Sequence, residues 1–313
     1  MASSCTPRKQ KNLVDPPRSN GFHLVPYEAL PTQNSKITCV EHPAYKGQRS
    51  QINIVIIFGY KDTRPSRFVA DLFEKNSLIN QFIRPCAPSN LEGACGFRSI
   101  SDSVSTFTKV LGQGAEARTV NLKILSSAIG PDDAANRLLP EQKNHSKNIE
   151  KEFHLALTQS DAIFYIGHSR DGGGPDFSPP KLTRDEHVDY PFYTRDKKDL
   201  NKMLGSLKKR SKNHPLLLGI MSCSSSEHFA AQLKETFKDL TLISSRILIY
   251  YTDALANTYR SVDAYLRREC ANEFSKRLRS QFSKNPSAIK IEGLLESPLK
   301  GKSKKPSQNK STN

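Results

Sequence analysis

A histidine and a cysteine each stand just beyond an apolar run of strand length. His168 follows the run 162–166 after one glycine, and Cys223 follows the run 216–221 after one serine. Ligands of open α/β sheets bind where the strands end, and a thiol beside an imidazole at that place forms a nucleophile–base pair. Each residue taken alone favours a structural role, but the matched positions make Cys223 a candidate nucleophile and His168 its base.

The residues after Cys223 predict the start of a helix. Ser224 and Glu227 have the spacing of a capping box, in which the serine caps the first turn and the glutamate reaches back to it. Cys223 would then lie at the positive end of the helix, where the pKa of a thiol is lowered and the reactive thiolate is favoured.

The elements that must position these residues alternate along the chain. Apolar β-branched runs predict strands, and apolar residues recurring every three or four positions predict helices. Strands are expected at 52–58, 120–124, 162–166, 216–221 and 247–251, and helices through 68–82, 104–111, 149–157, 200–207, 229–237 and 255–274, with Ser101 or Asp102 capping the second helix. Because a parallel crossover needs a helix, we expect an α/β fold, a three-layer αβα sandwich with a mostly parallel sheet.

Two long polar stretches, 127–146 and 169–196, interrupt this alternation. Loops of this length inside a compact domain are usually functional or disordered. The second loop begins directly after His168, so we expect it to form one wall of a cleft, with Asp171 or Asp176 near the substrate. The alternative is a solvent-exposed connection.

The two strand ends resemble those of the caspase-like cysteine peptidases, the group of caspases, metacaspases, legumains, clostripains, separases and CHAT domains. Their signature is an apolar strand ending in His-Gly and a second apolar strand ending in a small residue and Cys. His168 and Cys223 are 55 residues apart here, close to the spacing of about 50 in caspases. The chain departs from the pattern at Ser169, where glycine is usual, and at Met221, where members that cleave after Arg or Lys often have Asp. The caspase pentapeptide around the cysteine is absent.

The resemblance implies a caspase-like fold and a cysteine endopeptidase that hydrolyses peptide bonds with a His168/Cys223 dyad. It further implies an oxyanion hole formed by the backbone N–H groups of Ser169 and Cys223, with no cofactor and no metal. Asp253, which follows the expected strand 247–251, is a candidate acid for a basic residue of the substrate, so cleavage would follow Lys or Arg. Its alternative role is to cap the next helix.

Two other functions stay open. Gly167-His168-Ser169 also resembles the nucleophile elbow of α/β-hydrolases, with Ser169 as the nucleophile. Asp171 replaces the last glycine of that motif, and the later histidines His187, His214 and His228 follow no convincing strand. The other function, from a different class, is a catalytically silent caspase-like module that binds a partner.

The net charge of +16 is concentrated toward the two ends of the chain. Five lysines and no acid lie from residue 300 onward, and the first 20 residues carry four basic side chains against one acid. Such tails are expected to keep the protein in solution, or to make weak contacts with nucleic acid or an anionic surface. Apart from these contacts, the expected partner is a protein or peptide substrate.

Composition and cysteines set the remaining expectations. The 313 residues suffice for one domain over 49–296, with an extended polar arm at 1–48 and a basic tail at 297–313. Without a visible signal peptide or transmembrane segment, we expect a cytoplasmic protein. Cys5, in Ala-Ser-Ser-Cys, allows a lipid-anchored or periplasmic alternative if the true start lies upstream. Whether Cys86 and Cys95 pair is left open, with free thiols slightly favoured.

Overall fold

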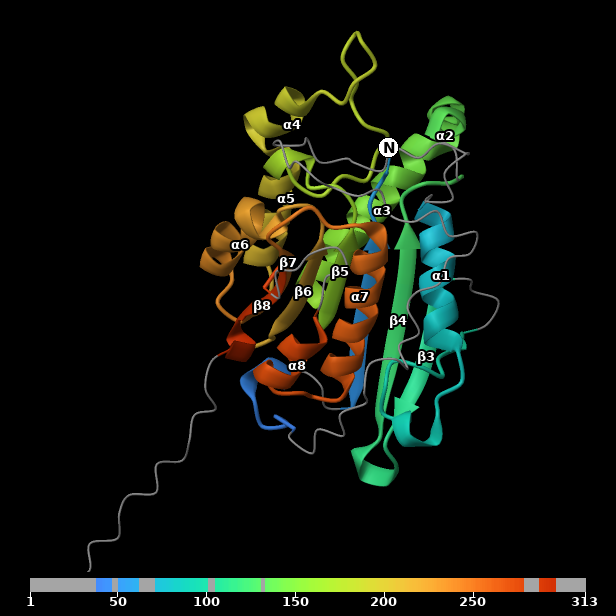
Figure 1. Cartoon of the computed structure of the whole chain (residues 1–313), viewed down its shortest axis with the longest axis vertical. Helices are drawn as coiled ribbons and strands as arrows, with labels where there is room; N and C mark the ends of the chain where they lie inside the picture. The colour runs from blue at the N-terminus through green and yellow to red at the C-terminus, as the bar shows by residue number, and fades with distance from the viewer. Residues whose placement is uncertain are drawn as a thin grey trace, which may run out of the picture.

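A mostly parallel sheet forms the centre of the protein (Figure 1). The computed structural model describes residues 38–46, 50–61, 71–100, 105–130, 133–278 and 287–296. Within these ranges the strand order is β2-β3-β4-β1-β5-β6-β7-β8. The pairings from β4 through β7 are parallel, and β2, β3 and β8 add antiparallel pairings at the two edges. The strands are β1 (Gln51–Phe58), β2 (Arg98–Ser99), β3 (Thr106–Leu111), β4 (Arg118–Ser126), β5 (Ala162–Ile166), β6 (Leu216–Met221), β7 (Leu240–Ser245) and β8 (Ile289–Gly293).

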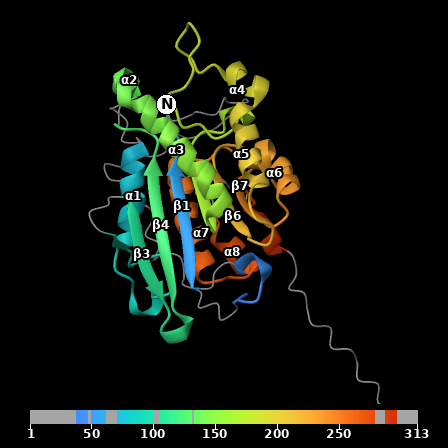
Figure 2. The same ribbon diagram turned by 180° about the vertical axis from the view of Figure 1, so that it is seen from behind.

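Helices cover both faces of the sheet, so the expected α/β architecture with a mostly parallel sheet is confirmed. One face carries α1 (Asp71–Ile83), α7 (Tyr251–Leu266) and α8 (Ala271–Arg277), and the other carries α3 (Pro140–Gln159), α5 (Lys198–Lys208) and α6 (Ser225–Thr236), as the two opposite views show (Figures 1 and 2). The short helices α2 (Asp133–Leu138) and α4 (Tyr190–Asp196) lie beyond the carboxyl ends of the parallel strands. We call this end of the sheet the carboxyl edge.

The central strands β5 and β6 consist of apolar and aromatic residues, because both of their faces are buried. In β1, Ile54 and Ile56 join the core under α1 and α7, whereas Ile57 joins the core under α3 and α5. Gly219 of β6 is paired with Phe164 of β5, and a Cβ at Gly219 would lie 2.3 Å from the Phe164 ring. Any larger residue at position 219 would clash with the Phe164 ring.

The expected strands of β1, β4, β5 and β6 are confirmed, as are the helices of α1, α3, α5 and α6. Two expected elements are wrong. Residues 106–111 form β3 instead of a helix, because Thr106, Thr108 and Val110 are β-branched and the segment pairs along β4. The strand expected at 247–251 is β7 at Leu240–Ser245, set by its pairing with β6. The apolar residues that follow serve for packing, since Ile249 lies against the core under α1 and α7.

Smaller differences concern the ends of elements. The single helix expected over 255–274 is divided into α7 and α8, with Cys270 as the residue before α8. Much of the stretch 127–146 is helical, since it contains α2 and the start of α3. The suggested caps Ser101 and Asp102 lie outside the described residues.

Two disulfides are present among the described residues, and one of them joins Cys86 and Cys95, the pair that the sequence leaves open. Cys86 is bonded to Cys95 across a short loop, and Cys39 is bonded to Cys270. The second bond fastens the described end of the N-terminal arm to the core, where Tyr45 packs on Tyr265 with 5.6 Å between ring centroids. The sequence could not reveal this pairing, because the two cysteines are 231 residues apart.

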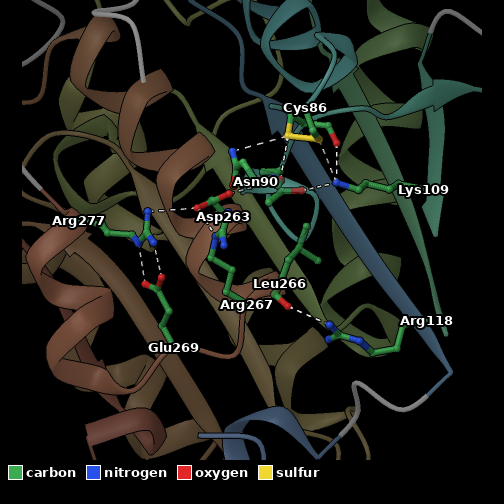
Figure 3. Close-up of polar contacts among 12 residues, drawn as sticks. Cys86, Asn90, Lys109, Arg118, Asp263, Leu266, Arg267, Glu269 and Arg277 are labelled. Carbon is green, nitrogen blue, oxygen red and sulfur yellow. Dashed lines mark hydrogen bonds and ion pairs between the residues drawn. A yellow bond between two sulfur atoms is a disulfide. The ribbon is translucent and has the colours of Figure 1, made fainter. Parts of the chain in front are cut away.

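The loop closed by Cys86–Cys95 is held by polar contacts from β3 and α7 (Figure 3). Lys109 of β3 donates to the carbonyl oxygens of Gly93 and Cys95 at 2.6 and 2.7 Å. The buried Asp263 of α7 accepts from the N–H of Ala94 at 2.8 Å and pairs with Arg267 at 3.0 Å. Burial lowers the pKa of Lys109 to about 8. These contacts give the cluster a structural role.

Along the part of the chain that the structure describes, no helix is long and apolar enough to cross a membrane. The basic tail at 297–313, Cys5 and the first 37 residues lie outside the described residues. The expectations of nucleic-acid contact, surface contact and lipid attachment therefore stay untested.

The two disulfides should differ in their effect on stability. A disulfide stabilises mainly by restricting the unfolded chain, and more so for a longer loop. Replacing Cys39 and Cys270 with serine should lower the free energy of unfolding by roughly 2–3 kcal/mol more than replacing Cys86 and Cys95. Urea denaturation without reductant measures both, and the Cys86/Cys95 variant is the matched control. Equal losses would contradict the loop-length explanation.

Candidate functional site

The strand register brings His168 and Cys223 to the same end of adjacent strands. Ile166 of β5 is the register partner of Met221 of β6, and both side chains belong to the core under α1 and α7. His168 and Cys223 each follow two residues later, and both are buried, with 7% and 8% of their surface exposed. The structure thus places the two sequence-predicted residues at matched positions beyond adjacent strands, at the carboxyl edge.

The turn after Cys223 leads directly into α6. The helix begins at Ser225, with Ser224 in the left-handed region at φ 50°. In this conformation Ser224 makes no side-chain cap, so the expected capping box is wrong. Ser225 ties the turn instead: its hydroxyl donates to Ile220 O at 2.7 Å and accepts from Ser245 N–H at 2.9 Å. Cys223 still precedes the positive end of a helix of three turns.

Cys223 is disulfide-bonded in the structure. Cys39, Cys86, Cys95 and Cys270 pair among themselves, so the partner of Cys223 is not one of the described residues. The form seen here therefore holds the candidate nucleophile in its oxidised state.

His168 is held as a neutral base. Its Nε2 is buried and has no hydrogen-bond partner within the described part of the chain. Burial, and to a smaller extent the charges of Arg170 and Lys61, move the pKa of the imidazole well below its usual value. Lys61 follows β1, which pairs with β5, and forms an ion pair with the buried Glu74 of α1.

The loop after His168 is largely buried as far as Phe177 and exposed over much of 181–187. Arg170 and Asp176 form an ion pair within it at 2.7 Å, with the Arg170 side chain fully buried. Asp176 was expected near a substrate, but its carboxylate is already matched by Arg170. Asp171 is exposed, and its Oδ1 lies 4.0 Å from Nε2 of His228 in the first turn of α6.

The sequence does not identify His228 as a site residue, because it follows no expected strand. The structure places it beside the Gly-rich loop, where a Cβ on Gly172 would lie 3.0 Å from its Nδ1. Burial lowers the pKa of His228, although Asp171 acts in the opposite direction. The signal that identifies its position is its place in the first turn of the helix after Cys223.

The remaining candidates occupy different surroundings. Ser169 is buried and leads into the short 3-10 helix η5 (Arg170–Gly172) instead of an α-helix. This lacks the strand–turn–helix context of a nucleophile elbow. Asp253 is buried in the first turn of α7, and Tyr250 occupies the N-cap position without a side-chain capping hydrogen bond. Neither the expected strand before Asp253 nor its role as the N-cap is present.

The segment between β7 and α7, which precedes Asp253, contacts the turn after Cys223. Ile247 O accepts a hydrogen bond from the Ser224 N–H at 3.0 Å, so this segment lies against the turn that follows Cys223. Asp253 therefore enters the fold from the carboxyl edge, in the first turn of a helix. Among the described residues no cluster of histidine, cysteine or acidic side chains is arranged to hold a metal ion.

Comparison with known proteins adds no family assignment. The sequence matches no protein-family model, and no curated protein matches it.

The buried histidine should make stability depend on pH. Because the folded pKa of His168 lies below the unfolded value of about 6.5, only the unfolded chain takes up the proton as the pH falls below 6.5. Its contribution to stability is thus lost on acidification, by up to about 1.4 kcal/mol per pH unit. Urea denaturation between pH 7 and 5 should show a shallower pH slope for His168→Leu than for the wild type.

The wild type is the reference for this measurement, and denaturation of both proteins at the same pH values gives the two slopes. A His168→Leu protein with an unchanged slope would contradict the buried, neutral imidazole.

Proposed function

We propose that this chain is a caspase-like cysteine endopeptidase that uses Cys223 as nucleophile and His168 as general base and acid. The observation that carries the proposal is the register of β5 and β6, which puts the two residues at matched positions beyond adjacent parallel strands. The unpartnered Nε2 of His168 supports it, because a buried ring nitrogen without a hydrogen bond is costly to a fold.

The proposed chemistry starts from the reduced protein. Cys223 transfers its proton to His168, and the thiolate attacks the carbonyl carbon of a peptide bond to form a tetrahedral oxyanion. The backbone N–H groups of Ser169 and Cys223 are the proposed donors to that oxyanion. The imidazolium then protonates the leaving amine, and its lowered pKa makes it a good acid for this step. Water, deprotonated by His168, hydrolyses the acyl-enzyme and restores the thiol.

Activity requires release of the disulfide at Cys223. A dithiol reductant attacks this disulfide, leaves as its own cyclic disulfide, and supplies the two electrons that free the Cys223 thiolate. Cys223 precedes the N-terminus of α6, which is positive. After reduction, this terminus therefore favours the thiolate form of Cys223 over the thiol. The proposal thus predicts a latent enzyme that is active only after reduction.

The disulfides also bear on the compartment. Such bonds persist in oxidising environments and are rare in the cytosol. The pairs Cys39–Cys270 and Cys86–Cys95 therefore favour folding in an oxidising compartment over the cytoplasmic location expected from the sequence.

The rival functions have less support. A serine hydrolase using Ser169 would need a helix directly after the nucleophile, whereas β5 is followed by η5 and a buried loop. A silent binding module does not require an unpartnered imidazole beside the cysteine position. The same variants separate all three functions.

Activity should depend on the dyad and not on Ser169. On a peptide library with dithiol reductant present, Cys223→Ala and His168→Ala should each lower the cleavage rate by about 10³-fold or more. Ser169→Ala is the matched control and should stay near the wild-type rate, because only its backbone N–H is used. Loss of activity in Ser169→Ala with full activity in Cys223→Ala would support the serine hydrolase. Absence of cleavage by the reduced wild type would contradict the proposed enzyme.

The finer proposal is cleavage after Lys or Arg, with Asp253 pairing with the basic side chain. Asp253→Asn should lower kcat/KM for such peptides by about 10²-fold relative to neutral ones, because a buried charge would lose its partner. Asp171→Asn is the comparison, since Asp171 is the exposed acid of the same region. If the specificity changes in Asp171→Asn and not in Asp253→Asn, Asp171 is the residue that recognises the basic side chain. Cleavage after acidic or small residues would rule out this role for Asp171 and for Asp253.

A further inference from the structure

Tyr165 lies on β5, three residues before His168, and its ring is fully buried. It packs in the core under α3 and α5, with centroid distances of 6.0 Å to Phe153 and 5.6 Å to Phe177. The chemistry of the proposed dyad makes no use of it. Its hydroxyl, however, lies at the carboxyl edge.

This hydroxyl joins the two ends of the buried loop after β5. The hydroxyl can donate its proton to His168 O at 3.0 Å or to Asp176 O at 3.2 Å. Its oxygen also accepts a hydrogen bond from Asp176 N–H at 2.9 Å. The backbone of His168 is therefore tied to the backbone of Asp176 through one oxygen atom.

Two glycines leave the room that this oxygen needs. A Cβ at Gly59 would lie 2.4 Å from the Tyr165 hydroxyl, and a Cβ at Gly167 would lie 2.5 Å from it. Gly59 follows β1 and Gly167 follows β5, so both neighbouring strand ends are shaped around the same hydroxyl.

The loop between these anchors has an unfavourable backbone. Arg170 and Asp171 are consecutive non-glycine residues with positive φ, at 46° and 53°. This conformation costs energy and persists only where the surroundings enforce it. The ion pair of Arg170 with Asp176 and the bonds to Tyr165 supply that enforcement.

We propose that Tyr165 is a positioning residue for His168, holding the backbone from which the imidazole is directed toward Cys223. This inference rests on the proposed cysteine hydrolase. Because Nε2 of His168 has no hydrogen bond in the described chain, its direction depends on packing and on the backbone that carries it. The Tyr165 hydroxyl fixes that backbone at the carbonyl of His168 itself.

Tyr165→Phe tests the proposal, because it removes one oxygen atom and keeps the ring. In the reduced enzyme kcat should fall by about 10-fold to 100-fold, as expected for a small displacement of a catalytic group, while KM changes little. NMR titration of His168 should show its pKa rising toward the usual value, because the released loop admits water to the imidazole. Gly59→Ala, which crowds the hydroxyl from the other side, should change both quantities in the same direction.

Tyr45→Phe is the matched control. Tyr45 is also buried and donates to a backbone carbonyl, that of Glu269, and its position at residues 38–46 is away from the carboxyl edge. It should lower thermal stability to a similar extent as Tyr165→Phe while leaving kcat and the His168 titration as in the wild type.

The outcomes distinguish failure of the positioning role of Tyr165 from failure of the proposed enzyme. Wild-type kcat and an unchanged His168 titration in Tyr165→Phe would overturn the positioning role and leave the dyad intact. Undiminished activity in Cys223→Ala would overturn the proposed enzyme, and the titration of His168 would still decide whether Tyr165 positions it. An equal fall in kcat for Tyr45→Phe and Tyr165→Phe would show that the loss of activity comes from lower stability, and would contradict the positioning role of Tyr165.

Discussion

The parallel register of β1, β5 and β6 is the constraint on which the rest of the structure depends. Phe58, Ile166 and Met221 are aligned across the three strands, so each chain segment leaves the sheet at one level. The residues that follow these strands therefore lie at the same edge of the sheet. They are Lys61 after β1, His168 after β5 and Cys223 after β6. The alignment is maintained by packing on both faces of the sheet, where a one-residue shift would exchange the two cores.

Burial then determines the chemistry available at that edge. The imidazole of His168 is neutral because the surrounding core and nearby cations disfavour its charged form. Ion pairs of Lys61 with Glu74 and of Arg170 with Asp176 match the charges that lie beside it. At this edge the strand register places the neutral His168 and the disulfide-bonded Cys223 at matched positions beyond adjacent strands.

Much of this could be predicted from the sequence where burial is continuous. The runs of β5 and β6 can be recognised from the sequence, and so can the residues that follow them, because doubly covered strands are apolar at every position. The run of β1 is recognisable in the same way from Ile54 to Phe58. The edge strands β3 and β8 carry a weaker signal: the residues of β3 also fit a helical spacing, and the short β8 has no apolar run that predicts it. The role of Asp176 could not be predicted, since its pairing with Arg170 depends on two residues of positive φ. The link from Tyr165 to Asp176 joins residues that are 11 positions apart, across a mostly irregular loop that leaves no periodic pattern.

The central claim is that Cys223, once reduced, is a nucleophile activated by His168. The most direct measurement is the rate at which a peptide-derived electrophile labels each cysteine of the folded, reduced protein, read by mass spectrometry. The account predicts that Cys223 is labelled much faster than in the unfolded chain, and that His168→Ala removes this acceleration. Labelling of Cys223 at the same rate in the folded wild type, the unfolded chain and His168→Ala would contradict it.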